Sequence, residues 1–426
     1  MYLFRLPRRL LVVRLAVVVL AAFSLLGQVA AAQSSDPSAP LAIRDALQAA
    51  WARHPGSRAT EAQLAAAQDR LNAAGQPIYN PEIELSADDE GPDRTGTIGL
   101  NLTLDLSGKR GVRRDAASAR LDLVSAQARL RRRDFAKQWF TSWAEVHTSR
   151  QRVSTGERRL GLMTRFGDIA EKQFLADDIS GLERDLALLA RDEAQAEQSQ
   201  LIADQADAEA RFRGVGGSLE SLAALTLPTD TLPPPAAVVA SVEQLPDWQA
   251  AQAALLATER EVAVARRNRI ADPTVGLRGG RIDYGNVRDR VIGVSISVPL
   301  FVRNGYRAEV VAAQADVDVA AADADRVRLE LEADRRRAID SYAAAQSTWT
   351  RWKASRGTDI ERRTTLLERL WREGELSTAN YLQQLKQTLD TQLAGAELEA
   401  RLWRSYTDYL AATGQLERWA GLEGTP

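Results

Sequence analysis

The stretch that decides the fold is Ile98-Gly99-Leu100-Asn101-Leu102-Thr103-Leu104, in which apolar and polar residues alternate strictly. Alternation with a period of two predicts a β-strand that has one apolar face and one polar face. The same pattern returns 194 residues later as Ile292-Gly293-Val294-Ser295-Ile296-Ser297-Val298. A strand that recurs at this spacing predicts a duplicated half rather than an array of short repeats.

Other matched motifs flank these strands. Asn80-Pro81 and Asp272-Pro273 each precede a first strand, and Asp178-Ile179-Ser180 matches Glu375-Leu376-Ser377. Each half is therefore expected to contain a helix, a β-hairpin, a very long helix, a turn and another helix. We predict a first repeat at 33–226, a proline-rich connection at 227–245 and a second repeat at 246–426. The hairpins are expected at about 81–106 and 273–300, and the long helical hairpins at about 109–213 and 305–420.

Two tracts without proline, 93–227 and 300–425, predict the long helices, because proline interrupts a helix. In the second tract, apolar residues step by three and four along one seam, as in a coiled coil: Val317, Ala320, Ala324, Val327 and Leu331. A helix over residues 109–174 would be about 100 Å long. Such a helix must pack along its length against other long helices.

The composition excludes several classes of protein. The chain has 426 residues, no cysteine and two histidines, whereas a structural zinc site needs four Cys or His ligands. A formal net charge of −2 is not typical of a nucleic-acid-binding protein. No pairing of a nucleophile with a base stands out, so we expect no enzyme, no cofactor and no metal site.

Two smaller features have ordinary explanations. His54 stands before Pro55, which favours a helix boundary at this point. The charge run Arg131-Arg132-Arg133 lies in a tract otherwise balanced by acids, which indicates a solvated helix face.

The N-terminus is typical of an export signal at residues 1–32. Arg5, Arg8 and Arg9 precede an apolar run over 15–26, and Ala30-Ala31-Ala32 provides a small-residue cleavage site. An uncleaved membrane anchor is the alternative. Because the chain has no cysteine, we expect no lipid anchor at the mature N-terminus.

Four strands with apolar faces in an exported chain would leave the outer edges of their sheet without hydrogen-bond partners. If the apolar faces meet lipid, unpaired strand edges are not tolerated and the sheet must close into a barrel. The smallest such barrels have about eight strands, so several copies must share one barrel. The alternative is a soluble periplasmic helical protein whose two hairpins pack on helices.

The order of elements, the duplication and the motifs resemble the TolC family of outer-membrane efflux channels. The run Leu106-Ser107-Gly108-Lys109-Arg110-Gly111-Val112-Arg113 resembles the heavy-metal, CzcC-like branch of that family, and Val298-Pro299-Leu300-Phe301 is similar to the general pattern. The resemblance implies a mainly α chain with a small β part. It also implies a homotrimer in which long helices form an α-barrel and the β-hairpins contribute to a shared transmembrane β-barrel of twelve strands.

The resemblance also implies partners and a site. The chain would be the exit duct of a tripartite pump in the outer membrane, docking through a periplasmic adaptor onto an inner-membrane RND transporter. The adaptor would contact the helix tips at Leu175, Ile179, Ser180, Leu376 and Ser377. The periplasmic entrance would include the acidic tip residues and the two uncharged positions that match the constricting carboxylates of the best-known member, namely Asp177, Asp178, Glu183, Glu373, Glu375, Asn380 and Gln383.

Carboxylates at a constriction concentrate cations, although acidic residues at helix starts are also favourable helix chemistry. The polar strand faces would line the outer pore, with Glu82, Glu84, Asn101, Thr103, Asp105, Ser295 and Ser297. The leading hypothesis is a passive channel for heavy-metal cations. Export of drugs or a polypeptide, a soluble periplasmic adaptor, and an exported enzyme are the alternatives, in falling order.

Overall fold

The computed structural model describes residues 39–91, 93–222, 225–235, 241–285, 287–356 and 360–422. The predicted signal peptide and part of the proline-rich connection, residues 236–240, lie outside this range.

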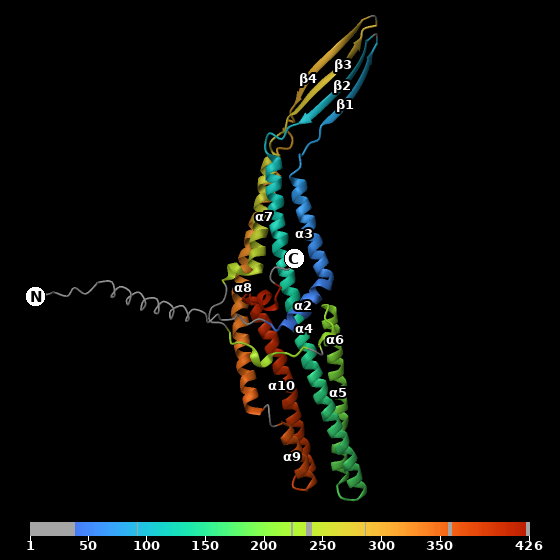
Figure 1. Cartoon of the computed structure of the whole chain (residues 1–426), viewed down its shortest axis with the longest axis vertical. Coiled ribbons are helices and arrows are strands. Elements are labelled where there is room, and N and C mark those ends of the chain that lie inside the picture. Colours follow the sequence, from blue (N-terminus) through green and yellow to red (C-terminus); the bar gives the residue numbers. More distant parts are fainter. Residues whose placement is uncertain are drawn as a thin grey trace, which may run out of the picture.

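The described chain is long and narrow, with a sheet at one end and paired helix tips at the other (Figure 1). The first half contains α2 (Leu41–Arg53), α3 (Pro55–Ala74), β1 (Glu82–Glu90), β2 (Asp93–Thr103), α4 (Lys109–Leu175), α5 (Gly181–Gly214) and α6 (Leu219–Leu222). Two short 3-10 turns follow, η1 (Thr229–Thr231) and η2 (Val242–Gln244). The second half contains α7 (Pro246–Asn268), β3 (Thr274–Asp283), β4 (Arg288–Ser297), α8 (Arg307–Arg356), α9 (Ile360–Arg372), α10 (Thr378–Ala412) and α11 (Leu416–Ala420). The prediction of a mainly α chain with a small β part is confirmed.

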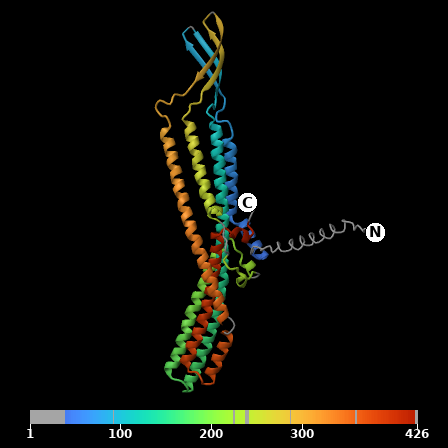
Figure 2. The same ribbon diagram turned by 90° about the vertical axis from the view of Figure 1, so that its left-hand side faces the viewer.

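Helix α4 runs the length of the helical body, from the base of the sheet to a tip (Figures 1 and 2). It has 67 residues and begins after Gly108, whose φ of 73° ends the extended chain that leaves β2. The carboxylate of Asp105 accepts hydrogen bonds from the backbone N–H groups of Lys109 and Arg110, both at 2.8 Å, which satisfies two donors that a helix start leaves unpaired.

His54 lies at the predicted helix boundary. Its Nδ1 accepts a hydrogen bond from the backbone N–H of Gly56 at 3.0 Å, and Pro55 is the first residue of α3. This places α3 beside the upper part of α4 and confirms the boundary.

The four strands form one antiparallel sheet in the order β1-β2-β3-β4. Its register puts Ile83, Leu100, Leu277 and Val294 in one row, so the apolar residues of both hairpins share one face. These side chains are 52–72% exposed. The sheet projects beyond the helices instead of packing on them (Figure 2). The alternative in which the hairpins cover a helical core is therefore wrong.

The largest core lies halfway along the helical body, where α2 and α11 meet α4, α5, α8 and α10. Trp139, Trp143, Trp403 and Tyr406 are fully buried there and contact one another or neighbouring rings at centroid distances of 5–7 Å. Aromatic side chains are prominent in this core, and each of them buries a large apolar area. This core fixes the helices relative to one another above the tips.

The expectation that Arg131-Arg132-Arg133 is a solvated run is wrong for two of its members. The side chain of Arg133 is 14% exposed and pairs with Asp247, and that of Arg132 is 11% exposed and pairs with Glu417 at 3.4 Å. The acids lie far along the chain, so the sequence run does not reveal that these arginines join α4 to α7 and α11. Among the described residues, no helix is both long and apolar enough to span a membrane.

Candidate functional site

The first helix tip is the turn between α4 and α5. Helix α4 ends with the N–H of Asp178 bonded to the carbonyl of Gln173 at 2.8 Å, while Asp177 takes a left-handed φ of 59°. Ser180 then starts α5: its hydroxyl accepts from the N–H of Glu183, and its own N–H donates to the Glu183 carboxylate at 2.9 Å. This reciprocal pair is a capping box, so Glu183 is used to hold the turn.

The second tip, between α9 and α10, repeats this turn 197 residues later. Gly374 takes the left-handed φ of 74° that Asp177 takes in the first, and the N–H of Glu375 bonds to the carbonyl of Leu370 at 3.0 Å. Ser377 caps α10 by accepting from the N–H of Asn380 at 3.4 Å. An amide side chain replaces Glu183 here, so the second cap lacks the reciprocal carboxylate.

The predicted adaptor-docking residues divide into two groups. Leu175 is 83% exposed at the end of α4, and Ser180 and Ser377 are exposed caps. Ile179 and Leu376 are partly buried against a tip core formed by side chains from α4, α5, α9 and α10. Leu175 can contact a partner directly, whereas Ile179 and Leu376 hold the turns.

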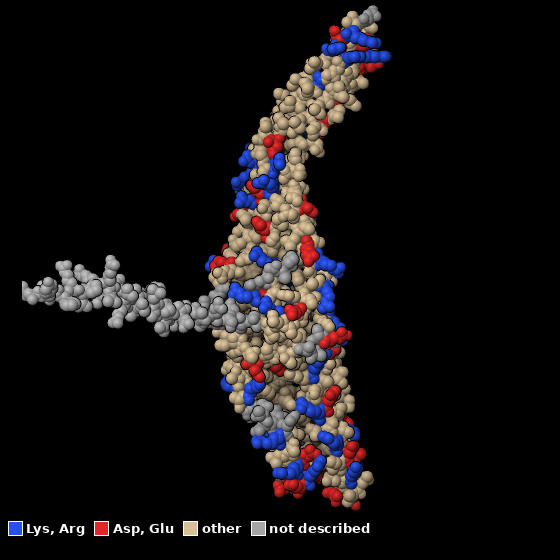
Figure 3. All heavy atoms as spheres, viewed as in Figure 1, with Lys and Arg blue, Asp and Glu red and all other residues tan. Residues whose placement is uncertain are grey.

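The predicted entrance carboxylates are all at the tips and mostly exposed. Asp177, Asp178 and Glu375 are exposed, and no ion pair involves them in the described part of the chain. Glu373 lies 3.9 Å from Arg369 one turn earlier, with both side chains more than half exposed. Asn380 and Gln383 are exposed on the first two turns of α10. The structure thus brings the acidic residues of both tips to one end of the molecule (Figure 3).

Ion pairs above the tips join helices of the two halves, and the sequence did not reveal them. The Arg159 side chain of α4 is 6% exposed and lies between Glu197 of α5 and Asp390 of α10, 3.2 Å from the latter. Lys386 of α10 pairs with Glu193 of α5, which holds the pKa of Glu193 below its ordinary value. These contacts fix the spacing of the helices that carry the tips.

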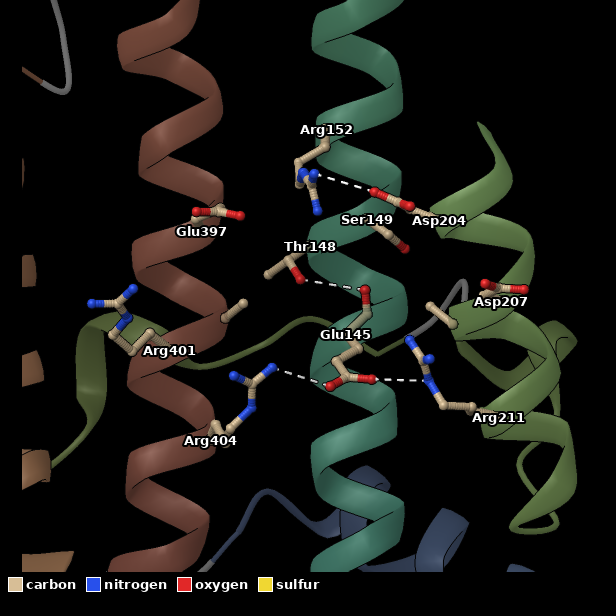
Figure 4. Close-up of a pocket in the computed structure, with 12 residues that line it drawn as sticks. Glu145, Thr148, Ser149, Arg152, Asp204, Asp207, Arg211, Glu397, Arg401 and Arg404 are labelled. Atoms are coloured by element: carbon tan, nitrogen blue, oxygen red, sulfur yellow. Dashed lines mark hydrogen bonds and ion pairs between the residues drawn. The ribbon is translucent and has the colours of Figure 1, made fainter. Parts of the chain in front are cut away.

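A charged pocket of about 340 Å³ lies further up between α4, α5 and α10 (Figure 4). Glu145 is at its centre and forms ion pairs with Arg211 of α5 at 3.4 Å and with Arg404 of α10 at 3.2 Å. Arg152 and Asp204 form a second pair at 3.4 Å. Four arginines and four acids line the pocket, so their charges balance and the pocket links helices without favouring either sign of ion.

At the other end, the polar residues predicted to line the outer pore share one sheet face. Glu82, Asn101 and Ser295 lie in one row across the sheet, and Thr103 and Ser297 lie in the next, with Thr274 between them. Two more contacts on this face are the bonds from Asn101 Nδ2 to Glu84 at 2.9 Å and between the hydroxyls of Thr103 and Thr274 at 2.8 Å. The alternation seen in each strand thus extends across both hairpins.

Asp105 is the exception, because it lies beyond the end of β2 at the junction of sheet and helices. Burial opposes its ionisation, but the backbone N–H groups at the start of α4 hold its pKa below the ordinary value. Beside it, Lys109 pairs with Asp272 at 2.8 Å, with side chains 10% and 2% exposed. The hydroxyl of Tyr79 also donates to Asp272 at 2.8 Å, and burial raises the pKa of Tyr79 to about 12.

These contacts join three connecting segments at the junction: the segment before β1, the segment after β2 and the segment before β3. The repeated Asp272-Pro273 motif marked the place in the sequence, but its pairing with Lys109 spans 163 residues and could not be predicted from spacing.

No family model matches the chain. The cobalt-zinc-cadmium resistance protein CzcC of Cupriavidus metallidurans is 26% identical over 293 residues, which cover 66% of this chain and 68% of that protein. The nickel-cobalt-cadmium resistance protein NccC of Alcaligenes xylosoxydans xylosoxydans is 25% identical over 275 residues, which cover 62% of each. The CmeC outer membrane channel of Campylobacter jejuni superposes with a TM-score of 0.72 over 88% of this chain and 86% of that chain, at 14% identity.

The chain has the fold of the TolC-like outer membrane channels. The resemblance inferred from the repeated strands and helix tips is confirmed, and so is its nearness to CzcC-like proteins. The described residues contain no group of three or more His, Asp or Glu side chains that could hold a metal ion.

Proposed function

We propose that this protein is the outer membrane channel of a tripartite efflux system and that it exports heavy-metal cations. The exposed sheet carries this proposal. The apolar side chains of its strands are exposed in the single chain. Its two edge strands, β1 and β4, each have one edge without a partner strand within the described chain. In lipid, both features require closure of the sheet with other copies. Three copies, as the TolC-like resemblance implies, supply twelve strands with the polar rows facing a water-filled pore.

The helix tips are the proposed periplasmic entrance and docking surface. They lie at the far end from the sheet, where acidic side chains are visible in Figure 3. Leu175 at the end of α4 is exposed. A periplasmic adaptor would contact these tips and connect the channel to an inner-membrane RND transporter, which selects the cargo. The acidic residues would raise the local concentration of cations at the entrance.

Heavy-metal export is supported by the two sequence relatives, both named as metal resistance proteins. Export of drugs or a polypeptide through the same architecture is the second candidate. It is favoured only by the fold, which this chain shares with the CmeC channel.

Deletion of the gene from its host tests the proposal. The strain should become more sensitive to Co²⁺, Zn²⁺, Cd²⁺ or Ni²⁺, and a plasmid copy should restore growth. Sensitivity to dyes and detergents alone would favour the second candidate. Unchanged sensitivity to both classes, in a strain that lacks a second channel of this fold, would contradict both.

A further inference from the structure

A band of exposed arginines lies at the junction between the helices and the sheet, on the ends of three helices. The band comprises Arg110 at the start of α4, Arg266, Arg267 and Arg269 at the end of α7, and Arg303 and Arg307 around the start of α8. These three helix ends meet at the base of the sheet, where Arg269 Nε donates to the carbonyl of Gly305 at 3.3 Å. Basic side chains gather at this level in Figure 3. We call this band the arginine collar.

The collar has a net positive charge because its six arginines outnumber the acids that lie near them. Asp272 pairs with the buried Lys109, and Asp105 accepts from backbone N–H groups. No ion pair involves any collar arginine in the described part of the chain. Among the exposed acids of the same helix ends, Glu309 accepts from Asn304 at 3.3 Å. Glu309 and Asp105 keep their negative charges, and they offset only part of the charge of the six arginines.

The favourable interaction of basic side chains with a helix C-terminus explains three of the six collar arginines. The arginines of α7 stand in or just beyond its last turn, where a positive charge is favourable. Arg110 and Arg307 instead stand in first turns, where the helix N-terminus is already partly positive. The first turn of α4 contains no acidic residue. Asp105 at the start of α4 and Glu309 in the first turn of α8 offset part of this positive charge, and the basic side chains of the collar remain in excess.

The collar borders the exposed apolar surface of the sheet. Leu106, Leu300 and Val302 lie between the strands and the helices, and their side chains are 73%, 78% and 86% exposed. A sharp change from apolar to arginine-rich surface is what the boundary between lipid tails and phosphate headgroups requires. Arginine is also the side chain that binds phosphate with two parallel hydrogen bonds.

We propose that the arginine collar binds the phosphate groups of anionic phospholipids in the membrane leaflet that faces the helical body. This inference rests on the proposed outer membrane location. The bound headgroups would compensate the excess positive charge of the collar and fix the depth at which the sheet sits in the membrane.

The test uses the purified full-length protein in detergent, titrated with phosphatidylglycerol or phosphatidylcholine and examined by native mass spectrometry. The wild-type protein should retain phosphatidylglycerol in preference to phosphatidylcholine. The variant Arg266→Gln/Arg269→Gln/Arg303→Gln/Arg307→Gln should bind phosphatidylglycerol at least about tenfold more weakly, since each arginine near an anionic surface contributes measurably. The same four positions changed to Lys should keep most of the binding.

The matched control is Arg58→Gln/Arg165→Gln/Arg336→Gln/Arg351→Gln, which changes the net charge equally at exposed positions of the helical body. It should bind phosphatidylglycerol as the wild type does. Equal loss in the control and collar variants, or no loss in the collar variant, would overturn the inference. Displacement of the lipid by soluble glycerol phosphate would also overturn it, because the site would then bind free phosphate.

Conductance of the same wild-type preparation in planar bilayers separates the two proposals. Channels without lipid preference would reject the collar alone, whereas no channels would reject the proposed function.

Discussion

Lys109 and Asp272 form the most buried ion pair of the described chain, and they do so where the sheet joins the helices. Tyr79 and Ser107 complete the contacts to the Asp272 carboxylate, at 2.8 and 3.4 Å. A buried pair of this kind contributes little net stability compared with an apolar pair, but loss of one partner leaves an uncompensated buried charge.

Replacement of Lys109 by Met should therefore lower the free energy of unfolding by about 3–5 kcal/mol. The double variant Lys109→Met/Asp272→Asn should be less destabilised than Lys109→Met alone, because the isolated charge is gone. Thermal unfolding in detergent measures both. Equal stability of Lys109→Met and the wild type would show that the pair does not hold the junction.

The capping box of the first tip makes that turn sensitive to acid. Hydrogen bonds from the Ser180 backbone and hydroxyl favour the charged form of Glu183, so its pKa lies below the ordinary 4.5. A lowered pKa in the folded state means that the stabilisation is fully present above pH 4.5 and is lost as the pH falls through the lowered value.

Amide hydrogen exchange in the first turn of α5 should accordingly become faster below pH 4.5, after correction for the intrinsic pH dependence of exchange. Glu183→Gln should remove this acid sensitivity, since an amide can cap at any pH. The equivalent turn of α10, capped by Ser377 beside Asn380, is the internal control and should show no such change. Acid sensitivity that persists in Glu183→Gln would contradict the assignment.

At the scale of elements, the alternation of apolar and polar residues and the positions of proline were enough to predict the strands and the long helices. Alternation over 98–104 and 292–298 gave the strand faces, and the absence of proline gave α4 and α8. The pairing of β2 with β3 could not be predicted, because it joins two hairpins of different halves. The ion pairs of Arg159 and the burial of Arg133 were missed for the same reason: their partners are distant in sequence and share no spacing rule.

The two faces of β4 should respond oppositely to charge. Val294→Lys would place an ammonium group on the apolar face and should destabilise the inserted protein by about 2–4 kcal/mol if the residue lies near the middle of the membrane. Ser295→Lys, on the adjacent residue of the polar face, is the matched control and should be tolerated. The amount of folded protein in washed outer membranes measures both. Equal yields of the two variants would contradict the assignment of faces.

Considered as a whole, the molecule has a sheet with an exposed apolar face at one end and helix tips that carry exposed carboxylates at the other (Figure 3). The acidic end is proposed to admit cations, so removal of its charge should change selectivity while the fold remains. The tip turns depend on backbone bonds and caps, and Glu373 and Glu375 take no part in these through their side chains.

The variant Glu373→Gln/Glu375→Gln should reduce the preference for cations over anions in the reversal potential measured under a salt gradient. Asp69→Asn/Glu157→Gln removes two exposed carboxylates of the helical body and should leave the preference unchanged. An unchanged reversal potential in the tip variant would remove the role of these carboxylates while leaving the channel itself intact.

The central claim is that several copies of this chain form a channel through the outer membrane. Conductance of the purified wild-type protein in planar lipid bilayers tests it most directly. We predict long-lived, uniform conductance steps that appear only with the trimeric fraction and that prefer cations. Absence of such steps, together with release of the protein from membranes by carbonate or high salt, would contradict the account.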